Sequence, residues 1–179
     1  MTLVNEQCEV VFDTLVKPLQ QLSLALLEST DLSTTIQVLN DSLLNDFQAD
    51  AVVICLLISE SQLSELNICN VSTVRTLAVD DEAYTAFSGV INGGKPLCGH
   101  LRHRQISYLF GEGAKDNIAS AAVVALNTHG TDSLKPRCLG LLGIGSRDAK
   151  RYHAGIATQF LSYLGELVGR SMGRYMPMH

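Results

Sequence analysis

The sequence has no long apolar run and no excess of basic residues. Its longest uninterrupted apolar stretch is Ala51–Ile58, whereas a helix needs about 20 apolar residues to cross a bilayer. Thirteen lysines and arginines against 18 aspartates and glutamates give a net charge of −5. These absences predict no transmembrane helix, no membrane association and no general nucleic-acid-binding surface.

The chain also lacks the features of a secreted protein. Residues 1–11 have neither a basic start nor an apolar core, so they do not form a signal peptide. The cysteines are odd in number and have no C-x-x-C spacing, which argues against a disulfide framework and against a zinc ribbon. We therefore expect a cytoplasmic protein with reduced thiols. The five cysteines are Cys8, Cys55, Cys69, Cys98 and Cys138.

Catalytic and nucleotide-binding signatures are absent as well. There is no G-x-S-x-G, no G-x-x-x-x-G-K-[ST], no G-x-G-x-x-G after a strand and no H-E-x-x-H. The nearest fragment, Gly143-Ile144-Gly145, lacks the third glycine. The sequence therefore indicates no catalytic mechanism and identifies no cofactor.

The chain does contain enough apolar residues for one packed core. Of its 179 residues 46% are hydrophobic, and the mean hydropathy is +0.18. At this length a chain buries roughly 70% of the surface that its unfolded form exposes, so neither disulfides nor metals are needed as staples. The composition predicts one compact domain with a helical appendage.

Three segments have helical periodicity. Apolar residues recur at steps of three and four over residues 5–28, where Pro18 predicts a kink or a restart of the helix. Residues 29–31 supply turn and N-cap chemistry for a second helix over residues 32–48. A long amphipathic helix over residues 154–175 ends the pattern.

Four segments have the composition of strands. Residues 51–58 are apolar at every position, which predicts a central strand covered on both faces. Residues 71–79 include polar side chains, which predicts a strand nearer the edge. Residues 118–126 and 138–146 are joined by a polar loop and are therefore expected to pair antiparallel.

The middle of the chain holds shorter elements. Residues 80–92 and 102–110 are expected to form helices that end at glycines, with an extended piece at residues 95–98 between them. The order of elements predicts an α/β (α+β) fold, in which a central antiparallel sheet carries helices on both faces. Small residues on the hairpin strands predict the close approach of a helix to the sheet.

Several short motifs resemble one protein family. With the hairpin of residues 117–126 and 139–148, they resemble the closing half of a GAF domain and, more narrowly, the bacterial family called domain of unknown function 484. The resemblance covers residues 20–172. Its motifs are Cys98-Gly99-His100-Leu101, Leu109-Phe110-Gly111, Gly145-Ser146-Arg147-Asp148, Thr158-Gln159-Phe160-Leu161 and Gly165-Glu166.

The resemblance implies a fold rather than an activity. It divides the chain into an N-terminal helical segment, residues 1–30, and a GAF-like domain, residues 31–175. Members usually carry a longer helical extension before the domain, so this chain resembles a short version. GAF-like domains of this kind commonly dimerise through a bundle of their terminal helices.

The apolar stripes of the first and last helices are wider than one contact face needs. Leaving about five leucine-sized side chains exposed would forgo roughly 1.5 to 3 kcal/mol each, a sum comparable to the whole stability of a domain. We therefore predict a homodimer that forms through the N- and C-terminal helices. The alternative is that both stripes are used within the monomer.

The predicted function is a non-enzymatic module for small-molecule sensing or protein interaction. Its ligand site is expected between the loop that starts at Cys98 and the hairpin, where Arg147 and nearby amides suit an anion. The predicted ligand-binding residues are Cys98, His100, Arg102, Ser120, Arg147 and Asp148.

Two alternatives concern Cys98. Together with His100 and His103 it forms a C-x-H-x-x-H pattern that suits zinc or copper, although a fourth ligand is missing locally. The nearby Arg102 and Arg104 would favour the thiolate form of Cys98, which suits a redox enzyme similar to a methionine sulfoxide reductase. A purely structural adaptor without a pocket is a third hypothesis.

Overall fold

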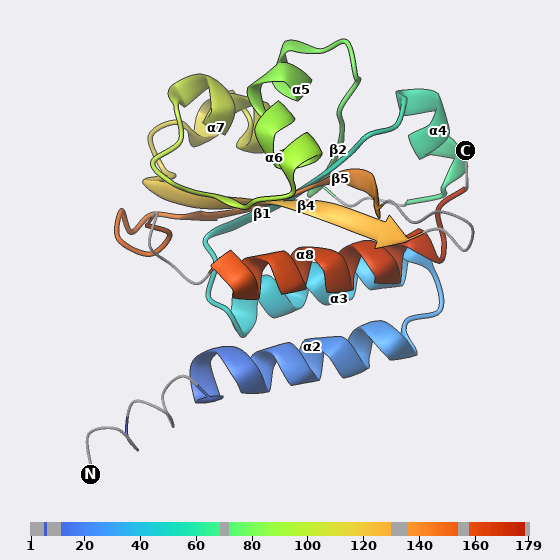
Figure 1. The fold of residues 1–179 in the computed structure, drawn as a ribbon, viewed down its shortest axis with the longest axis horizontal. Helices are drawn as coiled ribbons and strands as arrows, with labels where there is room; N and C mark the ends of the chain where they lie inside the picture. The colour runs from blue at the N-terminus through green and yellow to red at the C-terminus, as the bar shows by residue number, and fades with distance from the viewer. Residues whose placement is uncertain (1–5, 7–11, 69–71, 130–135, 154–157, 178–179) are drawn as a thin grey trace.

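The computed structural model describes residue 6 and residues 12–68, 72–129, 136–153 and 158–177. A five-stranded sheet lies between two layers of helices, which confirms the predicted mixed α/β class (Figure 1). The likeness to GAF domains stays a prediction. The strands, in their spatial order, are β2 (Val74–Thr76), β1 (Ala51–Leu56), β5 (Pro136–Ser146), β4 (Ser120–His129) and β3 (Leu97–Gly99).

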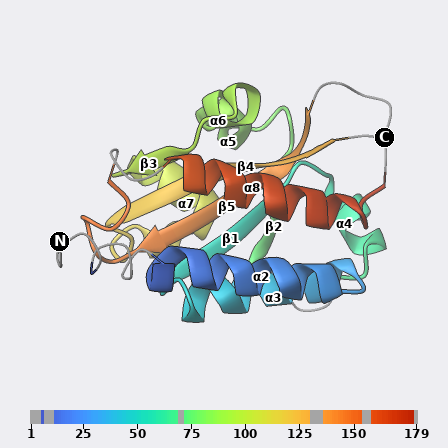
Figure 2. The ribbon, with the colours of Figure 1, turned by 60° about the horizontal axis from the view of Figure 1, so that its bottom comes forward.

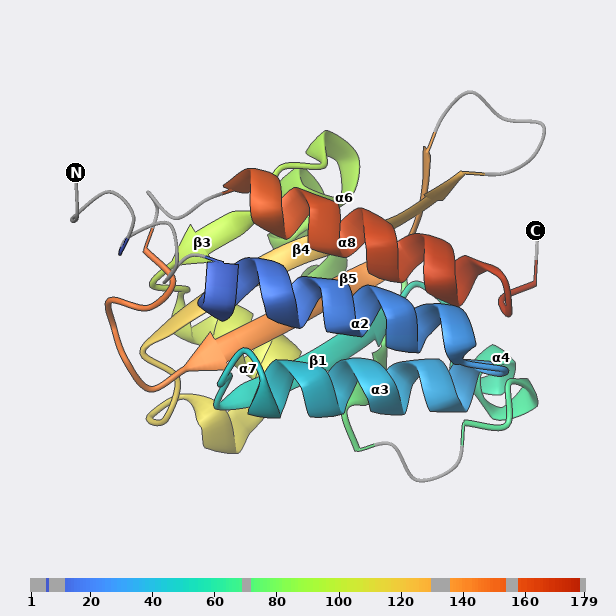
Figure 3. The ribbon, with the colours of Figure 1, turned by 90° about the horizontal axis from the view of Figure 1, so that it is seen from below.

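One face of the sheet is covered by α2 (Lys17–Glu28), α3 (Leu32–Asn45) and α8 (Thr158–Gly173). Figure 3 shows α2 between α8 and α3 and alongside both, and Figure 1 shows that α2 is the layer farthest from the sheet. The core on this side contains every second residue of β1 together with apolar residues of the helices, among them Leu22, Leu26, Val52, Ile54, Leu56, Leu164 and Val168.

The other face is covered by α5 (Glu82–Ala86), α6 (Ser88–Gly93) and α7 (His103–Phe110) (Figures 1 and 2). The alternate residues of the strands point into this second core. As predicted, β1 is buried on both faces. The second core includes Val53, Cys55, Phe87, Leu109, Val123 and Leu141.

Three of the four strand pairings are antiparallel, including the predicted pairing of β4 with β5. The pairing of β1 with β2 is parallel, so the sheet departs there from the predicted antiparallel arrangement. A short helix, α4 (Glu60–Glu65), lies in the connection between the two strands. This connection returns the chain to the end at which β1 begins, so β2 runs in the same direction as β1. This helix is an addition to the predicted elements, and Ser59 and Gln62 form its capping box.

The helix boundaries follow local signals. A π-helix, η1 (Phe12–Val16), precedes α2, which has Pro18 in its first turn, so the predicted restart at this proline is confirmed. The Asp31 carboxylate accepts a hydrogen bond from the Thr34 amide, 2.7 Å away, and caps α3. The single helix predicted over residues 80–92 is instead two helices, which meet at the buried Phe87.

The described helices are short. The longest, α8, has 16 residues, and a short 3-10 turn, η2 (Glu112–Ala114), follows α7. Within the described ranges, no helix combines the length and the hydropathy needed to span a membrane.

The approach of α8 to β4 depends on three glycines. Gly165, Gly169 and Gly173 are spaced four residues apart on the face that meets the strand. A Cβ atom at Gly169 would lie 2.5 Å from the Asn127 nitrogen and closer still to the Asn127 carbonyl oxygen. A helix therefore lies close to the hairpin, as expected, but the small residues that allow this approach belong to α8 rather than to the hairpin strands.

The C-terminal end of α8 holds the end of α2 in place. An Arg174 guanidinium nitrogen donates to the Leu26 carbonyl at 2.9 Å, and the Tyr175 hydroxyl donates to the Ser29 carbonyl at 2.6 Å. The final carbonyls of a helix have no partner within it, and a cation there also interacts favourably with the helix dipole. These contacts fix α2 to the rest of the domain.

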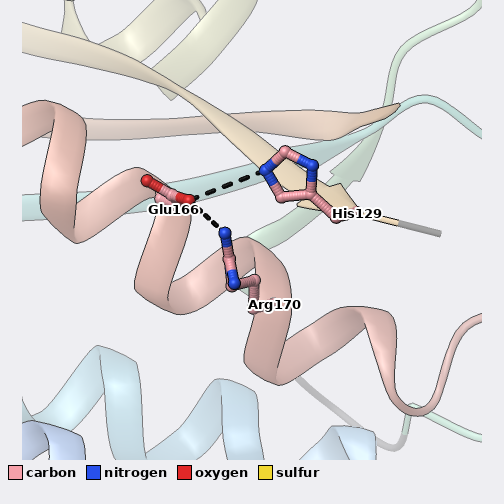
Figure 4. Close-up of polar contacts among 3 residues, drawn as sticks. All are labelled: His129, Glu166 and Arg170. Atoms are coloured by element: carbon pink, nitrogen blue, oxygen red, sulfur yellow. Dashed lines mark hydrogen bonds and ion pairs between the residues drawn. The ribbon is translucent and has the colours of Figure 1, made fainter. Parts of the chain in front are cut away.

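The surface contacts of α8 contribute less. Figure 4 shows the Glu166 carboxylate between Arg170, one turn further along α8, and His129 at the end of β4. The His129 Nε2 atom lies 3.7 Å from the carboxylate, and all three side chains are 40–57% exposed. Such exposed pairs contribute about 0–1 kcal/mol. Glycine packing, rather than these charges, sets the position of α8.

We expect Gly169→Ala to lower the free energy of unfolding by about 3 kcal/mol, because the added methyl group must displace backbone atoms of β4. Gly89→Ala in α6 is the matched control, since nothing lies within 4 Å of a Cβ atom there. That variant should gain about 0.5–1 kcal/mol from its higher helix propensity. Urea denaturation measures the free energy of unfolding of both variants. Equal changes in the two would contradict the close contact of Gly169 with β4.

Candidate functional site

Ser120 connects β4 to the loop that follows β5. Its hydroxyl donates to the Asp148 carbonyl at 2.5 Å and accepts from the Tyr152 amide at 3.3 Å. Its side chain is buried, so its hydrogen-bonding capacity serves the fold. The structure thus brings two predicted ligand residues, Ser120 and Asp148, into contact.

Cys98 and His100 lie near the same end of the sheet. Cys98 pairs with Ala122 across β3 and β4. The Nδ1 atom of His100 lies 2.6 Å from the Ala119 carbonyl oxygen, and because a carbonyl only accepts, Nδ1 carries the proton. The exposed imidazole is therefore oriented by the backbone that precedes Ser120.

The two predicted arginines lie in different places, Arg102 beside α7 and Arg147 at the exit of β5. Arg102 precedes α7 and lies with Arg104 and Tyr108 on the other helical face. The Arg147 amide donates to the Asp50 carboxylate at 2.8 Å, and this bond is the main reason that the pKa of Asp50 is lowered. Arg147 thus lies at a strand exit that is hydrogen-bonded to an aspartate, and the anion site there stays a prediction.

Among the described residues, burial is the influence that shifts the pKa of the Cys98 thiol. Burial raises its pKa, as it does for Cys138, and it raises the pKa of Cys55 to about 11. In the register of β4, Cys98 pairs with Ala122 and Cys138 with Asn127. Five residues along a strand correspond to about 17 Å, so these two thiols are not a redox pair. Cys8 and Cys69 lie outside the described residues.

The C-x-H-x-x-H pattern does not assemble into a cluster. In the part of the chain that the structure describes, no three His, Cys, Asp or Glu side chains gather in a way that would hold a metal ion. His100 is hydrogen-bonded to the backbone, and His103 lies in the exposed first turn of α7. The three residues are close in sequence but form no metal-binding group in the part of the chain that the structure describes.

A cavity of about 370 Å³ lies elsewhere, on the face covered by α2, α3 and α8. It is enclosed by η1, the end of α3, the loop after β5 and the start of α8, and none of the six predicted ligand residues lines it. Its volume falls within the usual range for small-molecule sites. The apolar walls include Leu15, Phe47, Ile144, Tyr152, Phe160 and Leu164.

Polar side chains surround the cavity. Asp13, Asp46 and Gln48 line it together with Arg151. The Arg151 guanidinium donates to the Phe47 carbonyl and lies 6.0 Å from the centre of the Tyr152 ring. Gln48 has a φ of 55°, in the left-handed region that glycine adopts more readily.

Little in the sequence indicates this cavity. Its residues come from four segments between positions 13 and 164. Phe47 and Phe160 belong to helical stripes, where they are indistinguishable from core residues, although their rings lie 5.9 Å apart in the fold. Only the fold brings these segments together.

The family model described as "Protein of unknown function, DUF484" matches residues 7–177. This range includes the whole sheet and all the helices that cover it. A comparison with curated proteins finds no match. The family match therefore supports the resemblance drawn from the motifs and adds no activity to it.

We expect Cys98 to be alkylated slowly at neutral pH, because burial raises its pKa and reduces the thiolate fraction. The rate should keep increasing with pH beyond the range in which a free thiol such as N-acetylcysteine reaches its plateau. Mass spectrometry after iodoacetamide labelling across a pH series measures the rate. A plateau near pH 7 would instead support the redox-enzyme hypothesis.

Proposed function

The chain belongs to the DUF484 family, whose description names no activity, and we propose that it acts as a homodimeric, non-enzymatic sensing or regulatory module. One observation carries this proposal: α2 is fixed to the domain by one face and exposes an apolar stripe on the other. The partner that fits this stripe best is a second copy of the same chain.

The apolar stripe consists of Val16, Leu24 and Leu27, with Gln20 between them. The three apolar side chains are 37%, 63% and 70% exposed. Steps of three and four place these positions on one side of the helix, and none of them is charged. The opposite side contains Leu22 and Leu26, which are fully buried. The exposed leucines are therefore not needed for the monomer's core.

Burial of this stripe would favour association. Covering a largely exposed leucine contributes about 1.5–3 kcal/mol at most. A two-fold dimer buries both copies of each leucine, so this contribution counts once for each subunit. An isologous contact also requires a surface that complements itself. A two-fold axis near the middle of α2 meets this requirement, because it places the apolar stripe of one copy against the same stripe of the other.

The charges at the two ends of α2 favour an antiparallel arrangement. Lys17 and Glu28 are both exposed and lie 11 residues apart, about 16 Å along the helix. Antiparallel packing of two copies about the helix centre brings each Lys17 next to the partner's Glu28. A parallel pair would instead place like charges together.

The last helix contributes indirectly to this proposed contact. The exposed positions of α8 are mostly polar, including Gln159, Ser162 and Arg170. Its large exposed apolar residue, Tyr163, lines a shallow surface together with Lys95 and Pro96. The bundle predicted from both terminal helices thus centres on α2, while α8 supports α2 from beneath.

We expect the protein to have about twice its chain mass of 19.4 kDa in solution, and Leu24→Asp/Leu27→Asp to be monomeric, because the substitutions place charges in the apolar contact. Val79→Asp is the matched control, since Val79 is 69% exposed and precedes α5 on the other face. Size-exclusion chromatography with light scattering measures the mass. A monomeric wild-type protein would refute the proposal.

The antiparallel arrangement makes a second, separate prediction. Lys17→Glu and Glu28→Lys should each weaken the dimer about tenfold at low salt, since each replaces two attractive pairs with repulsive ones. The double variant Lys17→Glu/Glu28→Lys should recover the wild-type dissociation constant. Sedimentation equilibrium measures it, and failure of the double variant to recover would exclude antiparallel packing.

A further inference from the structure

We propose that the cavity between η1, α3 and α8 binds a small organic amine, whose aromatic or branched aliphatic body enters the cavity and whose ammonium group stays at its rim. This inference rests on the proposed sensing function and deepens it by naming a ligand class and a site. It concerns none of the residues at the Cys98 end of the sheet.

The walls of the cavity suit an apolar body. Phe47 and Phe160 face it from the end of α3 and from α8, with ring centres 5.9 Å apart and planes tilted by 44°. The buried Tyr152 ring and the side chains of Leu43 and Leu164 complete the surface. Flat aromatic ligands pack favourably against tilted rings of this kind.

The charges around the cavity favour a cation. Asp13 and Asp46 are exposed carboxylates that line it from two different elements. Neither forms an ion pair with a residue that the structure describes. An ammonium group next to two carboxylates gains charge-assisted hydrogen bonds, whereas a carboxylate ligand would meet two like charges.

Arg151, the cation among the described lining residues, is already engaged by the protein. Its guanidinium donates to the Phe47 carbonyl and lies over the Tyr152 ring. Its charge also acts on Asp50, where it contributes to the lowered pKa of that carboxyl after the larger effect of the Arg147 amide. Arg151 therefore holds two walls of the cavity together, and its single positive charge leaves a net charge of −1 among the described lining residues, with Asp13 and Asp46 supplying −2.

Gln48 provides a second polar group at the rim. Its backbone has a φ of 55°, a conformation that is unfavourable for most residues other than glycine. A glycine would relieve this strain, so the side chain is kept at a cost to stability. Strain of this kind often marks functional sites, and the Gln48 amide oxygen can accept a hydrogen bond from an ammonium group.

The location of the cavity connects ligand binding to α2. Asp13 and Leu15 belong to η1, which continues directly into α2. The next residues, Val16 and Lys17, begin the surface proposed for dimerisation. A ligand held by η1 therefore contacts the segment that leads directly into the helix carrying this surface.

The full-length protein should bind 2-phenylethylamine with a Kd of the order of 1 mM or tighter, as a small fragment does. Two probes with the same ring provide the charge comparison: 2-phenylethanol should bind at least about tenfold more weakly, and 3-phenylpropionate should not bind. NMR titration measures all three. Equal or tighter binding of 3-phenylpropionate, or no binding of the amine, would overturn the proposal.

Variants locate the site. Asp13→Asn/Asp46→Asn should weaken amine binding at least about tenfold, whereas Asp41→Asn, an exposed position on α3 outside the cavity lining, should leave it unchanged. Gln48→Gly should raise the melting temperature and still weaken binding, which a purely structural role would not produce. Unchanged binding in the double variant would overturn the assignment.

The outcomes for the ligand and for the dimer are independent. A monomer that binds the amine through Asp13 and Asp46 refutes the proposed dimer and keeps the ligand site. A dimer that does not bind the amine refutes the ligand site and keeps the dimer.

Discussion

The contact between α8 and β4 determines the arrangement of one half of the molecule. With glycine at positions 165, 169 and 173, the helix lies so close to β4 that added Cβ atoms would meet the Ala125 and Asn127 backbone and the Val124 and Thr128 side chains. This position places Phe160, at the start of α8, in the wall of the cavity. It also places Arg174 and Tyr175, just beyond the end of α8, against the last carbonyls of α2.

The helix α2 is consequently fixed to the domain on one side and exposes apolar side chains on the other. Leu22 and Leu26 are buried beneath it, and the polar contacts of Arg174 and Tyr175 hold its end, so its orientation is fixed by the domain. Leu24 and Leu27 then point outward because a helix cannot bury all sides against two neighbours. A rigidly held apolar stripe loses little conformational entropy on association, which favours its use as an interface.

The cavity and the predicted ligand residues belong to different parts of the fold. At the end of the sheet, the Ser120 hydroxyl donates to the Asp148 carbonyl in the loop after β5, and His100 contacts the Ala119 carbonyl. That loop continues to Arg151 and Tyr152, which line the cavity on the helical side. Ser120 and Asp148 thus support the segment that carries this wall of the cavity without lining the cavity themselves.

The sequence by itself determined the elements. Period-two and period-three-to-four patterns, Pro18, Asp31 and Gly111 specify where most strands and helices begin and end, because these signals act over a few neighbouring residues. It did not determine the parallel pairing of β1 with β2, which depends on a six-residue helix. Only the tertiary structure decided that Phe47, Arg151 and Phe160 share one cavity and that Leu24 stays exposed. Such relations arise from contacts between segments distant in sequence, and local patterns carry no information about them.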